Sequence, residues 1–216
     1  MIHTCIGREW YVREFLVPSL IERGIPPDDI HVWLDDTGVG NLASCIESFT
    51  QCAKQLGETW HLQDDVILCS DFAERSRAAP EGVVCGFCVD KFEEGNTTEG
   101  STIARFMWQS SFPCIKIPND LAGEFAAWII DIAQHRDDTR KLYETGKKDD
   151  TLFYIFMLEK HFNMPVTNMV PHLVDHVDYL IGGSIINQSR KFIARSSHFI
   201  EQNLIQELKE KLASRN

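Results

Sequence analysis

Two adjacent carboxylates, Asp64 and Asp65, interrupt an otherwise apolar stretch over residues 60–68. Carboxylates at the end of a strand are costly to bury unless a ligand or a partner uses them. Mg²⁺ and Mn²⁺ prefer oxygen ligands, and such ions are commonly held by one or two carboxylates together with substrate phosphates. Because strand side chains alternate between faces, we expect Gln63 and Asp65 to point one way and Asp64 the other. Asp65 is then the predicted metal ligand, with Asp64 and Gln63 near ribose hydroxyls or metal-bound water; a solvated turn is the alternative.

Other residues suited to a phosphate or a nucleotide follow further predicted strands. Arg8 comes just after the first of them, where its guanidinium is suited to stack on a base or to pair with a phosphate, or simply to start a helix at the surface. Asp35 and Asp36 directly follow the second. The backbone N–H groups of Gly183 and Ser184 suit a pyrophosphate, although this glycine-rich segment is equally typical of a turn.

Strand-like and helix-like segments alternate along the chain, which predicts an α/β fold with a mostly parallel sheet. Apolar spacing indicates helices over about 8–23, with a kink or restart at Pro18, and from 41, 119 or 120, 149 and about 197. Apolar runs indicate strands at 2–6, 30–34, 83–89, 112–118 and 165–170, with a further strand before 83 that carries the Gln63-Asp64-Asp65 turn. Such sheets bind ligands beyond the carboxyl ends of their strands, where the acids described above are expected to lie.

The composition indicates an ordinary globular protein of one domain, or of one domain with a small appendage, in 216 residues. A net charge of −11 disfavours bulk binding of nucleic acid. We expect no transmembrane segment, no targeting segment and a cytoplasmic location, with the seven cysteines reduced. The CxxC pair Cys85 and Cys88 lacks the second pair that a zinc site needs, so we interpret it as structural.

Four segments in a consistent order resemble the small GT-A type glycosyltransferases of bacteria and phages, whose hallmark is a DxD or EDD-like metal motif. These segments are 8–36, 62–66 (LQDDV), 114–118 with 124–128 (CIKIP and EFAAW), and 171–177 (PHLVDHV). The order of the segments, more than any single motif, carries the resemblance. Two positions depart from the family pattern: Gln63 stands where an acid is usual, and His172 stands where serine is more usual.

The resemblance implies a GT-A-like three-layer α/β/α sandwich over residues 1–190, followed by an amphipathic helical tail over 191–216. It places a histidine at His176 as a second metal ligand beside Asp65. It also implies that Asp35 or Asp36 recognises the base of the nucleotide. Asp149 and Asp150 stand at a predicted helix N-terminus, where the dipole favours ionised carboxylates. The resemblance implies that Asp150, or Asp149 beside it, deprotonates the acceptor, although helix capping alone also explains them.

The expected function is therefore transfer of a sugar from a nucleotide-diphospho-sugar to a hydroxyl acceptor, with inversion, using Mn²⁺ or Mg²⁺. The acceptor is left open among a glycan, a protein, a lipid-linked intermediate and a modified base. The terminal amphipathic helix is suited to pairing two copies as a homodimer. Two alternatives are a metal-dependent nucleotidyltransferase or phosphohydrolase, which needs three or more clustered carboxylates, and a non-catalytic module that binds a sugar or a partner.

Overall fold

The computed structural model describes residues 1–36, 41–87, 100–103, 113–136, 149–182 and 199–214. For Asn41 and residues 100–103 it describes the backbone alone. Gly183, Ser184 and Cys88 lie outside the described residues, so the predictions made for them remain predictions.

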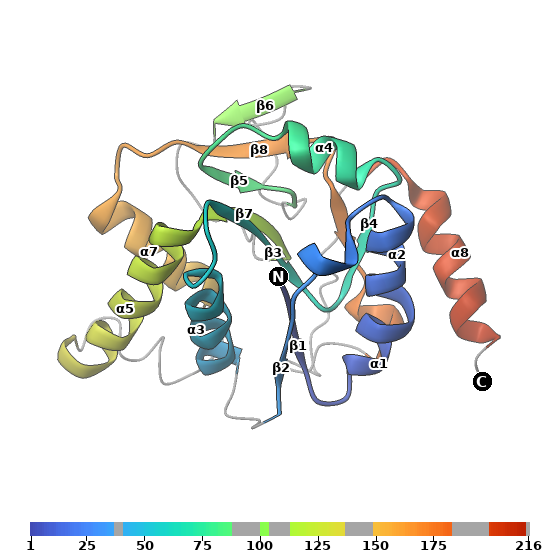
Figure 1. Cartoon of the computed structure of the whole chain (residues 1–216), viewed down its shortest axis with the longest axis horizontal. Helices are drawn as coiled ribbons and strands as arrows, with labels where there is room; N and C mark the ends of the chain where they lie inside the picture. Colours follow the sequence, from blue (N-terminus) through green and yellow to red (C-terminus); the bar gives the residue numbers. More distant parts are fainter. Residues whose placement is uncertain (37–40, 88–99, 104–112, 137–148, 183–198, 215–216) are drawn as a thin grey trace.

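Within the described residues, the central sheet has seven strands in the order β2-β1-β3-β7-β5-β8-β6 (Figure 1). They are β1 (Ile2–Cys5), β2 (Val32–Asp35), β3 (Glu58–Gln63), β5 (Val83–Cys85), β6 (Gly100–Ile103), β7 (Cys114–Pro118) and β8 (Val166–Val170). Strands β2, β1, β3, β5 and β8 run in one direction, and β7 and β6 run in the other. The prediction of an α/β fold with a mostly parallel sheet is confirmed, with the antiparallel strand β7 inside the sheet.

A second, two-stranded sheet pairs β4 (Val66–Leu68) with β9 (Val174–His176) in antiparallel fashion. The third strand was expected to carry the Gln63-Asp64-Asp65 turn, and β3 does end at Gln63. The apolar run that resumes after the turn is β4, which belongs to a different sheet. Asp64 and Asp65 form the turn between the two strands. Side chains alternate faces only along continuous strand, so strand alternation no longer gives a reason for the expected opposite orientation of these two acids.

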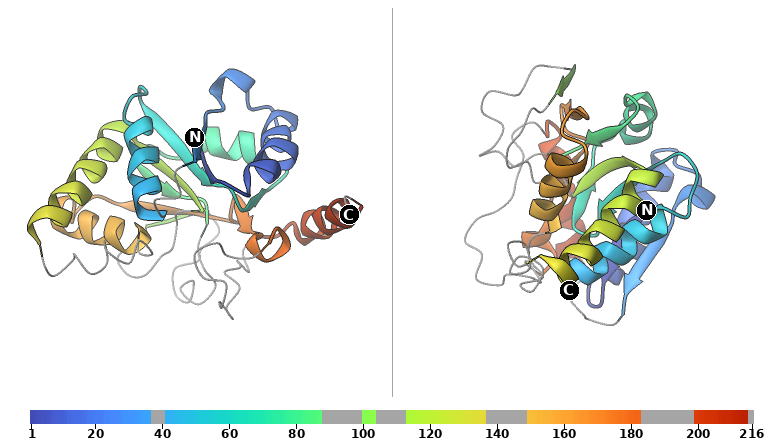
Figure 2. Two further views of the ribbon diagram at one scale, coloured as in Figure 1. Left: turned by 90° about the horizontal axis from the view of Figure 1, so that it is seen from below. Right: turned by 90° about the vertical axis from the view of Figure 1, so that its left-hand side faces the viewer.

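One core packs three helices against the sheet: α3 (Asn41–Cys52), α5 (Asn119–His135) and α7 (Asp149–Lys160). Figures 1 and 2 show these helices grouped on the same side of the molecule. Their largest buried side chains are Phe49, Phe125, Ile129 and Phe156. Burying an aromatic or large aliphatic side chain stabilises the fold by about 1.5–3 kcal/mol, so this core holds the helices firmly on the sheet.

The other core includes α1 (Glu9–Tyr11), a π-helical turn at Val12–Leu16, α2 (Val17–Glu22) and α4 (Phe72–Ala78). The helix restarts at Val17 with Pro18 in its first turn, as predicted, because proline lacks the N–H that an uninterrupted helix would use. Two 3₁₀ turns, Pro27–Asp29 and Asp178–Leu180, complete the described elements.

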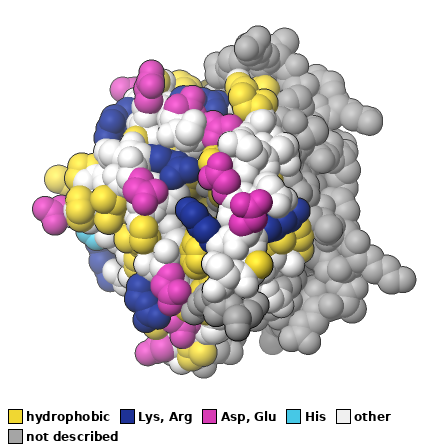
Figure 3. Space-filling view, turned by 90° about the vertical axis from the view of Figure 1, so that its right-hand side faces the viewer, with side chains coloured by type: hydrophobic (Ala, Val, Ile, Leu, Met, Phe, Trp, Pro, Cys, Tyr) yellow, Lys and Arg dark blue, Asp and Glu magenta, His cyan; other side chains and the backbone are white. Residues whose placement is uncertain are grey.

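The C-terminal helix α8 (Gln202–Ala213) belongs to this same core. Its residues Ile205 and Leu208, together with Phe199, are buried in one cluster with Leu62 and Val66. The helix is therefore packed into the same core as the strands on either side of the Asp64–Asp65 turn. On the outer face that includes α8, acidic and basic side chains are interspersed (Figure 3).

No helix in the described parts of the chain combines the length and apolar character that crossing a membrane requires. The described cysteines are free thiols, and Cys85 is buried in β5.

Candidate functional site

Arg8, Asp64 and Asp65 form a buried ionic cluster where β1 and β3 end. Arg8 Nη1 lies 3.1 Å from Oδ1 of Asp64 and also contacts Oδ2 of Asp65. The three side chains are only 5%, 10% and 12% exposed, respectively. Burial by itself lowers the pKa of Arg8, but Asp65 and Asp64 more than offset this and raise the pKa above its ordinary value. Arg8 therefore stays cationic and makes the burial of two carboxylates tolerable.

Asp64 is fixed by the end of β1 as well as by Arg8. Its Oδ2 accepts hydrogen bonds from Thr4 Oγ1 (2.9 Å) and from the backbone N–H of Cys5 (3.3 Å). Burial, followed by the charge of Asp65, raises the pKa of Asp64 to about 6 against the opposing effect of Arg8. The acid ties β1 to the turn, and both of its oxygens are occupied by the protein.

Asp65 is brought to His176 by the small sheet. Val66 pairs with His176 in the β4–β9 ladder, and the Val177 N–H donates to the Asp65 carbonyl oxygen across 2.7 Å. As a result, Asp65 Oδ1 lies 3.1 Å from His176 Nε2. Burial raises the pKa of Asp65, but His176 and Arg8 outweigh it and hold the pKa well below its usual range. The structure thus brings together the two residues expected to bind metal, although they are far apart in the sequence.

Asp178 is a member of the site that the sequence reasoning missed. Its Oδ1 lies 3.6 Å from Nδ1 of His176, and both side chains are 7% exposed. A carboxylate beside the second ring nitrogen orients a metal-binding histidine in many proteins. The acid two residues after His176 in the segment 174–178 (VDHVD) was the available sequence signal.

The Asp65 and His176 pair suits a divalent cation. Oδ1 of Asp65 is buried and faces Nε2 of His176, whereas Oδ2 contacts Arg8. One carboxylate oxygen and one imidazole nitrogen are donors that Mn²⁺ accepts and Mg²⁺ tolerates. Among the described residues, no three His, Cys, Asp or Glu side chains are grouped to hold a metal. With a cation at this pair, Asp65 and His176 would supply two ligands, and a phosphate-bearing substrate could supply others, as is common for Mg²⁺.

Asp35, Asp36 and Gln63 lie at the same edge of the sheet, because β2, β1 and β3 are parallel neighbours. Asp35 ends β2 and is buried, with its carbonyl oxygen accepting from the Ile6 N–H at 3.3 Å. Asp36 follows it and is exposed. Gln63 ends β3 and is half-buried. The structure therefore places all three within the region where the rule for parallel sheets expects a ligand.

Asp149 and Asp150 begin α7, as predicted. Asp149 is buried, whereas Asp150 is half-buried and accepts from the Thr151 N–H at 2.7 Å. Both acids act electrostatically on Cys45 of α3, so the start of α7 lies beside that helix. Among the hydrogen bonds and ion pairs of the described residues, none joins Asp150 to Asp65.

Beneath the site, α3 is linked to the sheet by two histidine–serine pairs that the sequence reasoning missed. His3 Nε2 lies 2.7 Å from Ser44 Oγ, and His61 Nε2 lies 2.8 Å from Ser48 Oγ. The spacing of the serines by four residues places them on one helix face. Burial lowers the pKa of His3 to about 4, despite the nearby charges of Asp35 and Asp65.

Comparisons of the chain with protein-family models, with curated proteins and with solved structures found no match.

Proposed function

We propose that this protein is a GT-A type glycosyltransferase that moves a sugar from a nucleotide-diphospho-sugar to a hydroxyl acceptor with Mn²⁺ or Mg²⁺. The observation that carries the proposal is the convergence of Asp65 and His176, 3.1 Å apart, at the edge where three parallel strands end. A carboxylate and an imidazole at this edge suit a cation that binds together with a diphosphate.

In this proposal, Asp65 and His176 would hold the ion, and a bound ion would supply charge neutralisation for the leaving nucleoside diphosphate. Asp178 orients the His176 ring from its second nitrogen. Arg8 compensates the two buried aspartates, and Asp64 is held by Thr4 and Cys5 so that the turn keeps its shape.

The same proposal gives roles to the remaining predicted residues. Asp35 or Asp36 recognises the base at the end of β2, with Gln63 near the ribose. Asp64 was expected near the ribose as well, but Arg8, Thr4 and Cys5 hold its oxygens, so it is assigned to shaping the turn. Gly183 and Ser184 contribute backbone N–H groups to the pyrophosphate. Asp150, with Asp149 beside it, accepts the proton of the acceptor hydroxyl, which corresponds to inversion. The position of both acids in the first turn of α7 supports this last role, because a helix N-terminus favours a negative charge.

The alternative chemistry on phosphate esters with two metal ions needs a larger cluster of carboxylates. Among the described residues, Asp64 and Asp65 share Arg8 and are not grouped with a third acid as a metal site. This arrangement favours the single-ion glycosyltransferase.

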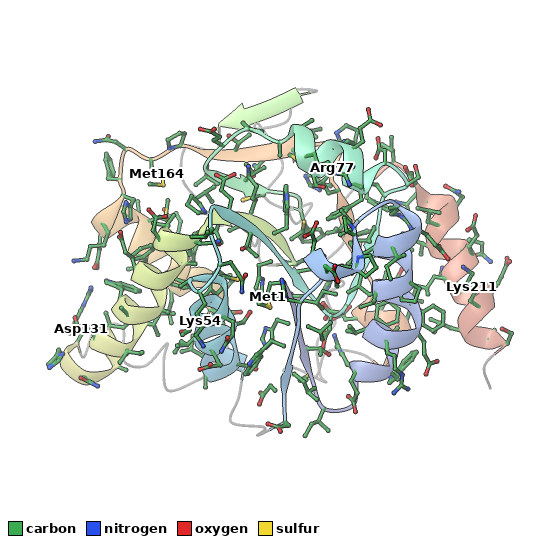
Figure 4. The ribbon with its side chains drawn as sticks, viewed as in Figure 1. Met1, Lys54, Arg77, Asp131, Met164 and Lys211 are labelled. Carbon is green, nitrogen blue, oxygen red and sulfur yellow. The ribbon has the colours of Figure 1, made fainter. Side chains whose placement is uncertain are left out.

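The direct test is a thermal-shift screen of nucleotide sugars with and without Mn²⁺ on the wild type and on Asp65→Ala. Asp131→Ala is the matched control, since Asp131 lies on α5 with its side chain 66% exposed (Figure 4). A donor that raises the melting temperature only with metal, in the wild type and the control but not in Asp65→Ala, supports the proposal. No shift with any donor in either metal state would refute it.

A further inference from the structure

We infer that Arg8 sets the ligand preference of the site formed by Asp64, Asp65 and His176: it weakens binding of a free divalent cation and strengthens binding of a cation together with a diphosphate. The inference rests on the proposed function, because it concerns the same cation and the same diphosphate. It assigns to Arg8 a specificity role beyond contact with the substrate.

The first part of the argument is the charge that a cation meets. With Arg8 in contact with both acids, the two carboxylates and one guanidinium sum to −1, whereas without Arg8 the acids alone present −2. A guanidinium within a few ångströms of a dication repels it, by at least about tenfold in affinity even at high effective dielectric. Arg8 is 5% exposed, so salt screens this repulsion less than at the surface.

The second part is which atoms Arg8 leaves accessible to a cation. Arg8 contacts Oδ2 of Asp65, whereas Oδ1 of the same carboxylate faces His176. A cation held by Oδ1 and His176 therefore binds beside Arg8, and the guanidinium does not have to leave. Its charge acts on every ligand that enters the site.

The third part is the sign change that a diphosphate brings. A nucleoside diphosphate carries more negative charge than one divalent cation neutralises. The complex of the two is therefore an anion, and the Arg8 guanidinium attracts it. Guanidinium groups are well suited to phosphate oxygens, because they donate several hydrogen bonds in a fixed fork. The backbone of Arg8 is anchored, since its N–H donates to the Cys5 carbonyl oxygen at 3.1 Å where β1 ends.

The test measures binding in two titrations, neither of which depends on activity. Free MnCl₂ is titrated and followed by electron paramagnetic resonance, and UDP, GDP, ADP and CDP are then titrated calorimetrically at saturating Mn²⁺. The proteins are the wild type, Arg8→Met, Arg8→Gln, Arg8→Lys and the control Arg13→Met, whose arginine side chain is 73% exposed. Arg8→Gln keeps hydrogen-bond donors beside the acids without the charge, and it replaces Arg8→Met if that variant does not fold.

We expect the two neutral variants to bind free Mn²⁺ roughly tenfold more tightly and the bound nucleoside diphosphate at least about tenfold more weakly than the wild type. Arg8→Lys should keep the Mn²⁺ affinity of the wild type, and Arg13→Met should match the wild type in both titrations. If Arg8 only positioned the two acids, its replacement would weaken the binding of Mn²⁺ and of the nucleoside diphosphate together.

Loss or no change of Mn²⁺ affinity in the neutral variants, with a nucleoside diphosphate still binding to the wild type, would overturn the inference and leave the proposed function standing. If the wild type binds none of the nucleoside diphosphates with Mn²⁺, the proposed function fails and the inference fails with it.

Discussion

Thr4 Oγ1 donates a 2.9 Å hydrogen bond to Oδ2 of Asp64, and this contact joins the end of β1 to the turn between β3 and β4. Both side chains are buried. The bond connects two segments that are sixty residues apart in the sequence. It also holds Asp64 where Arg8 can contact both Asp64 and Asp65.

Thr4→Val removes this hydrogen bond while nearly keeping the side-chain shape. A hydrogen bond to a charged group contributes about 1.5–3 kcal/mol, so we expect a loss of that order in the free energy of unfolding. Urea denaturation at pH 7.5 measures it. Thr50→Val is the control, because the Thr50 hydroxyl donates only within α3, to the Ile46 carbonyl oxygen at 2.8 Å. If both variants lost the same free energy of unfolding, the hydrogen bond to Asp64 would contribute no more than an ordinary hydrogen bond within a helix.

Asp178→Asn tests the support of His176. Replacing a carboxylate beside a metal-binding histidine typically weakens metal affinity by about 10–100-fold. We expect a Mn²⁺ affinity reduced within that range, with little change in melting temperature without metal. Asp131→Asn, an exposed change on α5, provides the comparison. Unchanged Mn²⁺ affinity in Asp178→Asn would mean that the 3.6 Å contact does not orient the ring.

His3 gives stability a pH dependence of defined sign. Its pKa falls from 6.5 to about 4 on folding, chiefly through burial. Between these two pH values the unfolded chain binds more protons than the folded protein, so the free energy of unfolding rises with pH. The contribution of His3 to stability is therefore complete above pH 6.5 and is lost as the pH falls toward 4. It amounts to about 3 kcal/mol at most.

The measurement for His3 is the unfolding free energy from pH 4 to pH 7.5, in the wild type and in His3→Gln. Asp64, with its pKa raised to about 6, contributes the opposite slope, with stability falling as the pH rises toward that value. The difference between the two proteins therefore isolates His3. We expect this difference to grow from pH 4 to about pH 6.5 and then to level off, and His135→Gln, at an exposed site, to keep the pH profile of the wild type. A constant difference would contradict the role given to burial.

Leu208→Ala tests whether α8 is part of the fold or an appendage. Leu208 is 5% exposed and belongs to the core that includes Leu62 and Val66. Truncating a buried leucine costs about 2–5 kcal/mol, and we expect a loss in that range. The control is Leu56→Ala, whose leucine is 98% exposed and should cost less than about 0.5 kcal/mol. A small effect at Leu208 would mean that α8 detaches without cost to the core.

The class of fold and the edge that carries the site were predictable from the sequence. Apolar periodicity predicted the α3, α5 and α7 helices, the restart beside Pro18, and β8 within a residue. These features depend on the spacing of apolar residues over short stretches of chain, which can be read from the sequence. The acids after β2 and β3 were likewise placed at the carboxyl edge, because parallel strands end together.

The tertiary structure alone decided how the site is assembled. Antiparallel β7 is inserted in the sheet, and Arg8 contacts both Asp64 and Asp65; neither feature was expected from the sequence. The resemblance placed His176 beside Asp65, but the 3.1 Å approach of the two side chains depends on the pairing of β4 with β9. Local sequence patterns do not predict such long-range contacts, because the packing of the whole chain determines strand partners and buried ion pairs. The sequence by itself determined which residues could perform the chemistry, and the fold decided which of them meet.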